Sequence, residues 1–117
     1  MSIRAIVVED EPLVREALAD FLEAAGIDVV GIASGGAEAI SSVAAFLPDV
    51  VIMDLRLPGM DGVEATRIIK ESYPFIRIIM LSVHDDIGFR RPAFEAGADA
   101  YLHKGCDPTE LLATVKG

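Results

Sequence analysis

The chain of 117 residues has one cysteine, no tryptophan and no long hydrophobic run. A single cysteine, Cys106, excludes a disulfide bond within the chain and fits the reducing environment of the cytosol. No apolar stretch approaches the roughly 20 residues that a membrane-spanning helix needs, and the N-terminus shows no signal-peptide pattern. We therefore expect a soluble protein of the cytoplasm that does not associate with membranes.

Positive charge is also scarce, because ten Lys and Arg residues face nineteen Asp and Glu residues and give a net charge of −9. A surface this negative repels the phosphates of nucleic acids and of anionic lipids. We therefore expect no direct nucleic-acid binding by this domain. The hydrophobic fraction of 52% indicates one ordered domain, and the length is sufficient to bury a core.

Short apolar runs alternate with segments of helical periodicity along the whole chain. The runs predict buried strands at residues 3–8, 29–33, 50–53, 76–83 and 100–103. Amphipathic segments follow each of the first three strands, and two more helices are expected after the last two. Five strand–helix units in succession predict a single α/β domain, in which a doubly wound parallel sheet carries helices on both faces.

Two prolines bear on the last helices. Pro92 falls inside the expected fourth helix, where an interior proline costs about 3 kcal/mol. We therefore expect that helix to be short and to begin near Pro92, leaving residues 84–91 as a long, mobile loop. Asp107 is predicted to cap the fifth helix, with Pro108 at its first position. Because the chain ends about three turns into that helix, we expect residues 1–117 to be the N-terminal part of a longer protein.

Polar residues lie at or just after the ends of four of the five predicted strands. Glu9 and Asp10 follow the first strand, Asp54 follows the third, Ser82 lies near the end of the fourth and Lys104 follows the fifth. Open parallel sheets bind their ligands at the carboxyl ends of the strands. Each residue alone also has an ordinary structural explanation: an acid that caps the next helix, a loop-initiating aspartate, a buried hydroxyl or a solvated lysine. Their joint occurrence favours a functional site.

Four segments carry a family resemblance: Val-Val-Glu-Asp-Glu at 7–11, Asp-Leu-Arg-Leu-Pro-Gly-Met-Asp-Gly at 54–62, Leu-Ser at 81–82 and Tyr-Leu-His-Lys at 101–104. Together they resemble the signature of bacterial two-component response-regulator receiver domains, and the resemblance covers essentially the whole chain. The pair Lys104-Gly105 resembles a variant that is common in receivers of LuxR-type transcriptional regulators. The resemblance implies a flavodoxin-like (βα)5 fold of strand order 2-1-3-4-5, in which the first and third strands are neighbours.

The resemblance also implies a phosphoryl-acceptor site. Asp54 would be the phosphoacceptor, and Mg²⁺ (or Mn²⁺) would be bound directly by Asp10 and Asp54, through water by Glu9, and by the backbone carbonyl of Arg56. The residue chemistry agrees with this assignment. Clustered carboxylates raise one another's pKa unless a cation lies between them, and oxygen ligands suit Mg²⁺. An ionised Asp54 is then a nucleophile for phosphoryl transfer, which depends mainly on positioning and on neutralisation of charge.

The remaining roles concern the switch. Lys104 would supply positive charge to the transferred group and Ser82 a hydrogen bond, while Tyr101 would turn inward when Ser82 is drawn towards the phosphoryl group. The signalling face would comprise the fourth helix, fifth strand and fifth helix. Many relatives have a proline after the lysine, joined by a cis bond that helps to aim it. Gly105 stands there in this chain, so a different backbone arrangement is expected.

As implied by the resemblance, a sensor histidine kinase donates the phosphoryl group. An output domain, DNA-binding and covalently attached, or a separate partner protein then receives the signal, and a homodimer that forms on phosphorylation is also compatible. The domain would show only autocatalytic phosphoryl acceptance and slow self-dephosphorylation, not ordinary enzymatic turnover.

Two alternatives remain open. A phosphorylation-independent protein-interaction module on the same fold is favoured by Pro92 and Gly105, and disfavoured by the complete acidic pocket and lysine. A phosphatase with an aspartate nucleophile is disfavoured because Arg56 occupies the position where a second aspartate is expected. The two histidines, His84 and His103, have no metal-ligand partners at suitable spacing, so we expect them on the surface or in loops.

Overall fold

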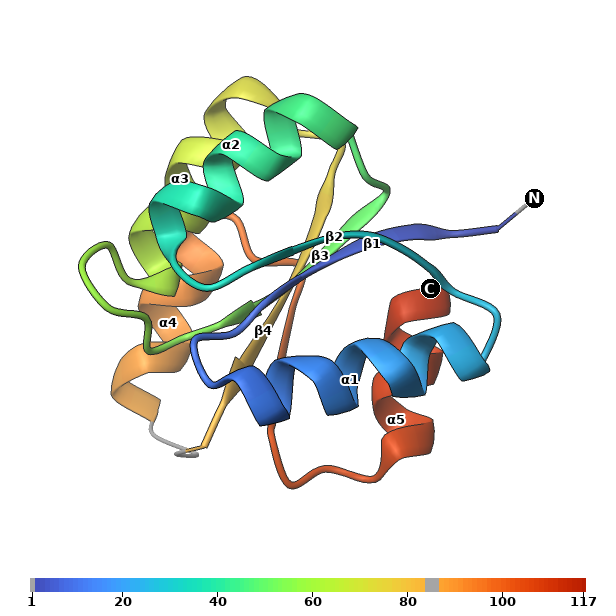
Figure 1. Cartoon of the computed structure of the whole chain (residues 1–117). Coiled ribbons are helices and arrows are strands. Elements are labelled where there is room, and N and C mark those ends of the chain that lie inside the picture. The colour runs from blue at the N-terminus through green and yellow to red at the C-terminus, as the bar shows by residue number, and fades with distance from the viewer. Residues whose placement is uncertain (1, 84–86) are drawn as a thin grey trace.

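The computed structural model describes residues 2–83 and 87–117, which form five strands and five helices in strict alternation (Figure 1). In chain order these elements are β1 Arg4–Val8, α1 Pro12–Ala24, β2 Asp28–Ala33, α2 Gly36–Phe46, β3 Val50–Asp54, α3 Gly62–Ser72, β4 Arg77–Ser82, α4 Ile87–Glu95, β5 Ala100–His103 and α5 Pro108–Lys116. All five strands predicted from the apolar runs are confirmed. Among the described residues, no helix is long and apolar enough to cross a membrane.

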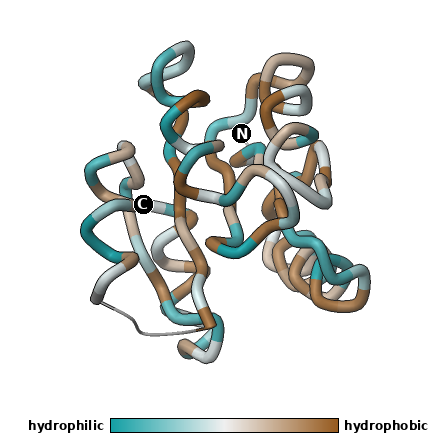
Figure 2. The backbone as a smooth tube through the Cα atoms, turned by 90° about the vertical axis from the view of Figure 1, so that its left-hand side faces the viewer, coloured by the Kyte–Doolittle hydropathy of each residue, from teal (hydrophilic) through white to brown (hydrophobic). Residues whose placement is uncertain are grey.

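The strands form one parallel sheet in the order β2-β1-β3-β4-β5, which confirms the order implied by the family resemblance. Helices α1 and α5 cover one face of the sheet, whereas α2, α3 and α4 cover the other (Figure 1). The strands carry long hydrophobic stretches, and the helices alternate between hydrophobic and hydrophilic residues (Figure 2). A sheet buried on both faces requires this pattern.

Alternate residues of each central strand belong to different halves of the core. In β1, Ile6 and Val8 pack with the residues of α2 and α3, whereas Ala5 and Val7 pack with those of α1 and α5. Every residue of β3 is buried. Successive side chains of a strand point to opposite faces, so each central strand supplies apolar side chains to both halves of the core.

The register of the central strands brings the predicted site residues to one edge of the sheet. Val8, the last residue of β1, pairs with Met53, and Asp54 pairs with Leu81. Glu9 and Asp54 therefore both follow the Val8–Met53 pair directly. The last pair of β4 and β5 joins Ser82 to His103, which places Lys104 at the same edge.

Local sequence signals account for several helix ends. Asp61 caps α3, since its Oδ1 accepts a hydrogen bond from Glu64 N at 2.8 Å. Asp107 caps α5 by accepting from Thr109 N at 2.9 Å, as predicted. Helix α1 ends before Gly26, whose φ of 88° lies in the left-handed region that glycine adopts at low cost.

The prediction for the fourth helix was wrong. Helix α4 begins at Ile87 and contains Pro92 in its interior, so residues 87–91 are helical. The remainder of the predicted loop, residues 84–86, lies outside the described residues. Pro92 has no N–H to donate to the carbonyl of Gly88, four residues earlier, and this removes one hydrogen bond from the helix.

Packing of α4 on the core explains why the helix continues through the proline. Ala93 in α4 and Ala96, the residue after the helix, are buried, and Pro92 itself is exposed. The guanidinium of Arg90 lies 5.4 Å from the ring of Phe94 and 5.7 Å from that of Tyr101. Burial of two alanines and two cation–π contacts offset the cost of a single lost hydrogen bond.

The substitution Pro92→Ala should stabilise the protein, because it restores a donor to α4 at an exposed position. We expect the free energy of unfolding, measured by urea denaturation, to rise by about 1–3 kcal/mol. Glu71→Ala, an exposed position of α3, is the matched control and should change it by less than about 0.5 kcal/mol. An unchanged or lower stability for Pro92→Ala would show that the proline carries no such cost.

Candidate functional site

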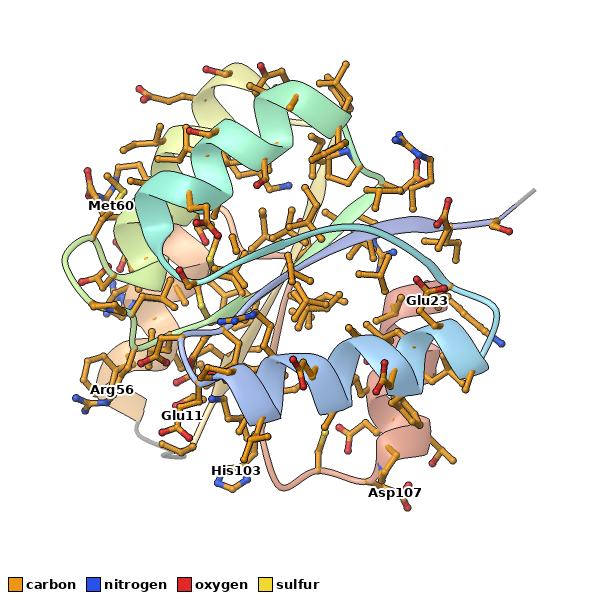
Figure 3. The ribbon with its side chains drawn as sticks, in the orientation of Figure 1. Glu11, Glu23, Arg56, Met60, His103 and Asp107 are labelled. Atoms are coloured by element: carbon orange, nitrogen blue, oxygen red, sulfur yellow. The ribbon has the colours of Figure 1, made fainter. Side chains whose placement is uncertain are left out.

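The carboxyl edge of the sheet gathers residues from segments that are far apart in the sequence. Glu11 follows β1, Arg56 follows β3 and His103 ends β5, and all three lie along this edge (Figure 3). An open pocket of about 350 Å³ lies here. It is lined by Glu9, Asp10, Glu11, Val14, Asp54, Arg56, Val83 and Lys104.

Three carboxylates converge in this pocket, as predicted from the strand ends. Glu9, Asp10 and Asp54 each place one carboxylate oxygen within 4.8 Å of the others. Glu9 is 2% exposed and Asp54 is 6% exposed, whereas Asp10 faces solvent. Oxygen donors at such spacing suit a hard divalent cation, so the residues present fit Mg²⁺.

Lys104 lies between the two buried carboxylates. Its ammonium Nζ donates to Asp54 Oδ2 at 3.1 Å and also forms an ion pair with Glu9. The backbone holds the lysine at this point, because Lys104 N donates to Ser82 O at 2.8 Å. One cation therefore compensates two negative charges that burial would otherwise destabilise.

The two buried carboxyls differ in their pKa. Burial raises the pKa of Asp54 to about 6 from its usual 3.8, and although the Lys104 charge opposes this shift, the nearby Glu9 charge adds to it. Burial also acts to raise the pKa of Glu9, but hydrogen bonds from Lys104 and the backbone of Glu11 outweigh burial and lower it. Glu9 is therefore the more firmly ionised partner of the lysine.

The same contacts set the pKa of Lys104. Burial alone would lower the pKa of the Lys104 ammonium, but its hydrogen bond to Glu9 and the charge of Asp54 raise it above the usual value. The ammonium consequently stays protonated at neutral pH. A permanent positive charge next to Asp54 is what the transfer of an anionic group to that carboxylate requires.

Arg56 reaches the site through its backbone. Its N–H donates to Asp54 Oδ1 at 3.4 Å, and its guanidinium lies 5.1 Å from the ring of Phe89 on α4. The predicted role of its carbonyl as a metal ligand stays a prediction. The alternative that the acids after β1 cap α1 is not supported, since Glu11 occupies the capping position without a side-chain hydrogen bond.

Ser82 and Tyr101 are not among the residues that line this pocket. Ser82 is 2% exposed at the end of β4, and Tyr101 is 7% exposed and packs beside Phe94 with ring centroids 6.5 Å apart. Within the described residues, the Tyr101 hydroxyl is buried without a hydrogen-bond partner. Their assignment as switch residues stays a prediction.

Two residues that support the site were missed from the sequence. One is Gly62, where a Cβ would collide with the carbonyl oxygen of Asp54. Only glycine permits α3 to begin so close to the strand that carries Asp54. The other is Arg15 on α1, which donates to the carbonyl of Glu9 at 2.9 Å, and an arginine on an amphipathic helix gives no signal of such a contact.

Of the two histidines, His103 is exposed as expected, and His84 lies outside the described residues.

The raised pKa of Asp54 has a consequence for stability. Between pH 3.8 and about 6 the unfolded chain releases the Asp54 proton while the folded protein retains it, so stability falls as the pH rises through this window. Asp54→Asn should therefore increase the free energy of unfolding at about pH 7.5, and the gain should shrink at about pH 5. Urea denaturation at both pH values measures this difference.

Asp20→Asn, on the exposed face of α1, removes the same charge elsewhere and serves as the control. Its effect should be small and similar at both pH values. A wild-type protein that is more stable than Asp54→Asn at about pH 7.5 would contradict the electrostatic description of the site.

Comparisons with known proteins agree with this fold. The family model of the response regulator receiver domain matches residues 5–116. The response regulator UvrY of Escherichia coli K12 is 40% identical over 115 residues, which are 97% of this chain and 53% of that protein. The response regulator GacA of Pseudomonas viridiflava is 36% identical over 115 residues, 97% of this chain and 54% of that protein. The chain thus spans about half the length of the curated relatives it matches.

Solved structures of response regulators have the same fold as this chain. A LuxR-family two-component response regulator from Aurantimonas sp. SI85-9A1 superposes with a TM-score of 0.94 at 38% identity, covering 99% of this chain and 84% of that chain. The signal receiver domain of NarL from Mycobacterium tuberculosis gives a TM-score of 0.89 at 34% identity, covering 99% of this chain and 98% of that chain. The chain belongs to the response regulator receiver domain family.

Proposed function

We propose that this domain is a phosphorylation-controlled switch of a two-component system, in which Asp54 accepts a phosphoryl group from a sensor histidine kinase. One observation carries the proposal: a buried aspartate at a strand end lies 3.1 Å from a lysine ammonium and adjoins two further carboxylates. A purely structural ion pair would need only one carboxylate for one lysine. The surplus negative charge, together with the open pocket, favours a site that binds a divalent cation and an anionic group.

The chemistry follows from the positions of the side chains. Because the pKa of Asp54 is about 6, this carboxyl is mostly ionised at neutral pH, and one of its oxygens can attack phosphorus. A bond forms between this oxygen and phosphorus while the bond from phosphorus to the donor breaks, and the donor leaves with the electron pair. Lys104 is placed to pair with an oxygen of the transferred group as its contact with Asp54 is released.

Mg²⁺, held by Asp10 and Asp54, through water by Glu9, and by the carbonyl of Arg56, would neutralise charge on the phosphoryl oxygens when bound. Asp10 is the exposed member of the cluster, and it is therefore the ligand that a cation arriving from solvent meets first.

The output of the switch involves the face formed by α4, β5 and α5. In this proposal, Ser82 donates a hydrogen bond to the phosphoryl group, and Tyr101 repositions in response. An unpartnered buried hydroxyl costs about 1–3 kcal/mol, so the described position of the Tyr101 ring is one that the protein can exchange for another. Such a balance between two positions is what a conformational switch requires.

The partner of this face belongs to the same proposal. The curated relatives are about twice as long as this chain, so we assign the signal to an output domain that follows residues 1–117 and that binds DNA, as in LuxR-type regulators. The receiver domain itself, with a net charge of −9, is not the part that contacts DNA. The kinase, the switch and its output would all act in the cytoplasm.

Incubation with acetyl phosphate and Mg²⁺, followed by intact-mass measurement, tests the acceptor. We expect a mass increase of one phosphoryl group that requires Mg²⁺, because Asp54 is the ionised nucleophile. Asp54→Asn should show no increase, whereas Asp20→Asn on α1 should behave like the wild type. A folded wild-type protein that gains no mass would reject the switch and favour a phosphorylation-independent interaction module.

Binding of Mg²⁺ can be tested separately from phosphorylation. A ligand that binds only the folded state at tenfold its dissociation constant stabilises it by about 1.4 kcal/mol, so Mg²⁺ should raise the melting temperature. Asp10→Asn should weaken this rise, because it removes an exposed ligand without disturbing the core. The same rise in Asp10→Asn as in the wild type would exclude Asp10 from the metal site.

A further inference from the structure

Hydrogen bonds donated by three consecutive backbone N–H groups hold the turn that carries Lys104. Lys104 N donates to Ser82 O at 2.8 Å, and Cys106 N donates to His103 O at 2.9 Å. Between them, Gly105 N donates at 2.9 Å to a side chain, the imidazole Nδ1 of His103. A single side chain, from the residue before the lysine, therefore holds the backbone of the residue after it.

The same imidazole also reaches the neighbouring strand end. Its Nε2 lies 2.8 Å from the carbonyl oxygen of Val83, the residue after Ser82. Because Nδ1 accepts a hydrogen bond, the proton of a neutral ring must be on Nε2, which can then donate to Val83 O. These two bonds define one tautomer of a neutral imidazole that joins the β5–α5 turn to the end of β4.

Gly105 is matched to this arrangement. A Cβ at residue 105 would lie 3.0 Å from Nδ1 and 3.2 Å from Cε1 of His103, so a side chain there would push against the ring. Glycine also leaves the backbone next to Lys104 with more conformational freedom than any other residue would. The bond from Gly105 N to the imidazole removes part of that freedom.

We propose that His103 is a positioning residue for Lys104. Its imidazole braces the backbone on both sides of the lysine and ties it to β4, so that the ammonium stays within 3.1 Å of Asp54 Oδ2. This inference rests on the proposed role of Lys104 in phosphoryl transfer. A displacement of about 1 Å in a group that neutralises developing charge is enough to slow a reaction.

The rate of Asp54 phosphorylation by acetyl phosphate and Mg²⁺, followed by intact mass, tests the proposal. His103→Ala removes both hydrogen bonds and should slow the reaction about threefold to tenfold, which is the effect of one or two exposed hydrogen bonds. His103→Asn should recover most of the rate, since an asparagine oxygen readily accepts from the N–H two residues further on. Lys104→Ala sets the scale for complete loss of the ammonium.

Two further measurements separate positioning from general stability. Mg²⁺ should still raise the melting temperature of His103→Ala, because the His103 imidazole is bonded to Gly105 N and Val83 O and not to Glu9, Asp10 or Asp54. Long-range ¹H–¹⁵N spectra of the wild type at about pH 8 should show a protonated Nε2 and an unprotonated Nδ1.

A rate for His103→Ala equal to that of the wild type would overturn the positioning role and leave the phosphorylation switch intact. Equal rates for His103→Ala and His103→Asn, both slow, would also overturn it, as would an imidazole protonated on Nδ1. A wild-type protein that accepts no phosphoryl group would reject the proposed function, and this inference with it.

Discussion

The sharing of one buried ammonium by two buried carboxylates is the interaction on which the rest of this structure depends. Two negative charges and one positive charge leave a deficit that the apolar core below cannot compensate. This uncompensated negative charge lies at the carboxyl edge of the sheet, in an open pocket that water, a cation or an anionic group with its counter-ion can reach. Glu9 keeps the lysine charged, and Asp54 carries the cost of incomplete pairing. Asp54, the proposed phosphoryl acceptor, is thus the less well compensated of the two.

The topology of the sheet makes this arrangement possible. Because β1 and β3 are neighbours although α1, β2 and α2 separate them in sequence, their ends form a crevice from which helices leave in opposite directions. The core below it is apolar on both faces of the sheet and holds the strand ends in a fixed register. The strands beneath and the turns above therefore hold the carboxylates of the site in place.

Much of the fold and of the candidate site was predictable from the sequence, and the reasons differ between elements. The apolar runs that precede Glu9, Asp54 and Lys104 identify buried strands, since a parallel sheet leaves few other uses for such runs. The length of α4 was not predictable, because a local cost at Pro92 was outweighed by packing against distant parts of the core. The tautomer of His103 depends on a carbonyl at the end of another strand, and no sequence pattern encodes that contact.

The contact between Lys104 and Glu9 joins positions 95 residues apart. A contact of such long sequence separation requires the chain to lose the entropy of a large loop. A chain whose last strand has not yet docked therefore has its acidic pocket without its cation. The complete site therefore exists only in the fully folded domain, and a partly folded molecule lacks the lysine that the proposed phosphoryl transfer requires.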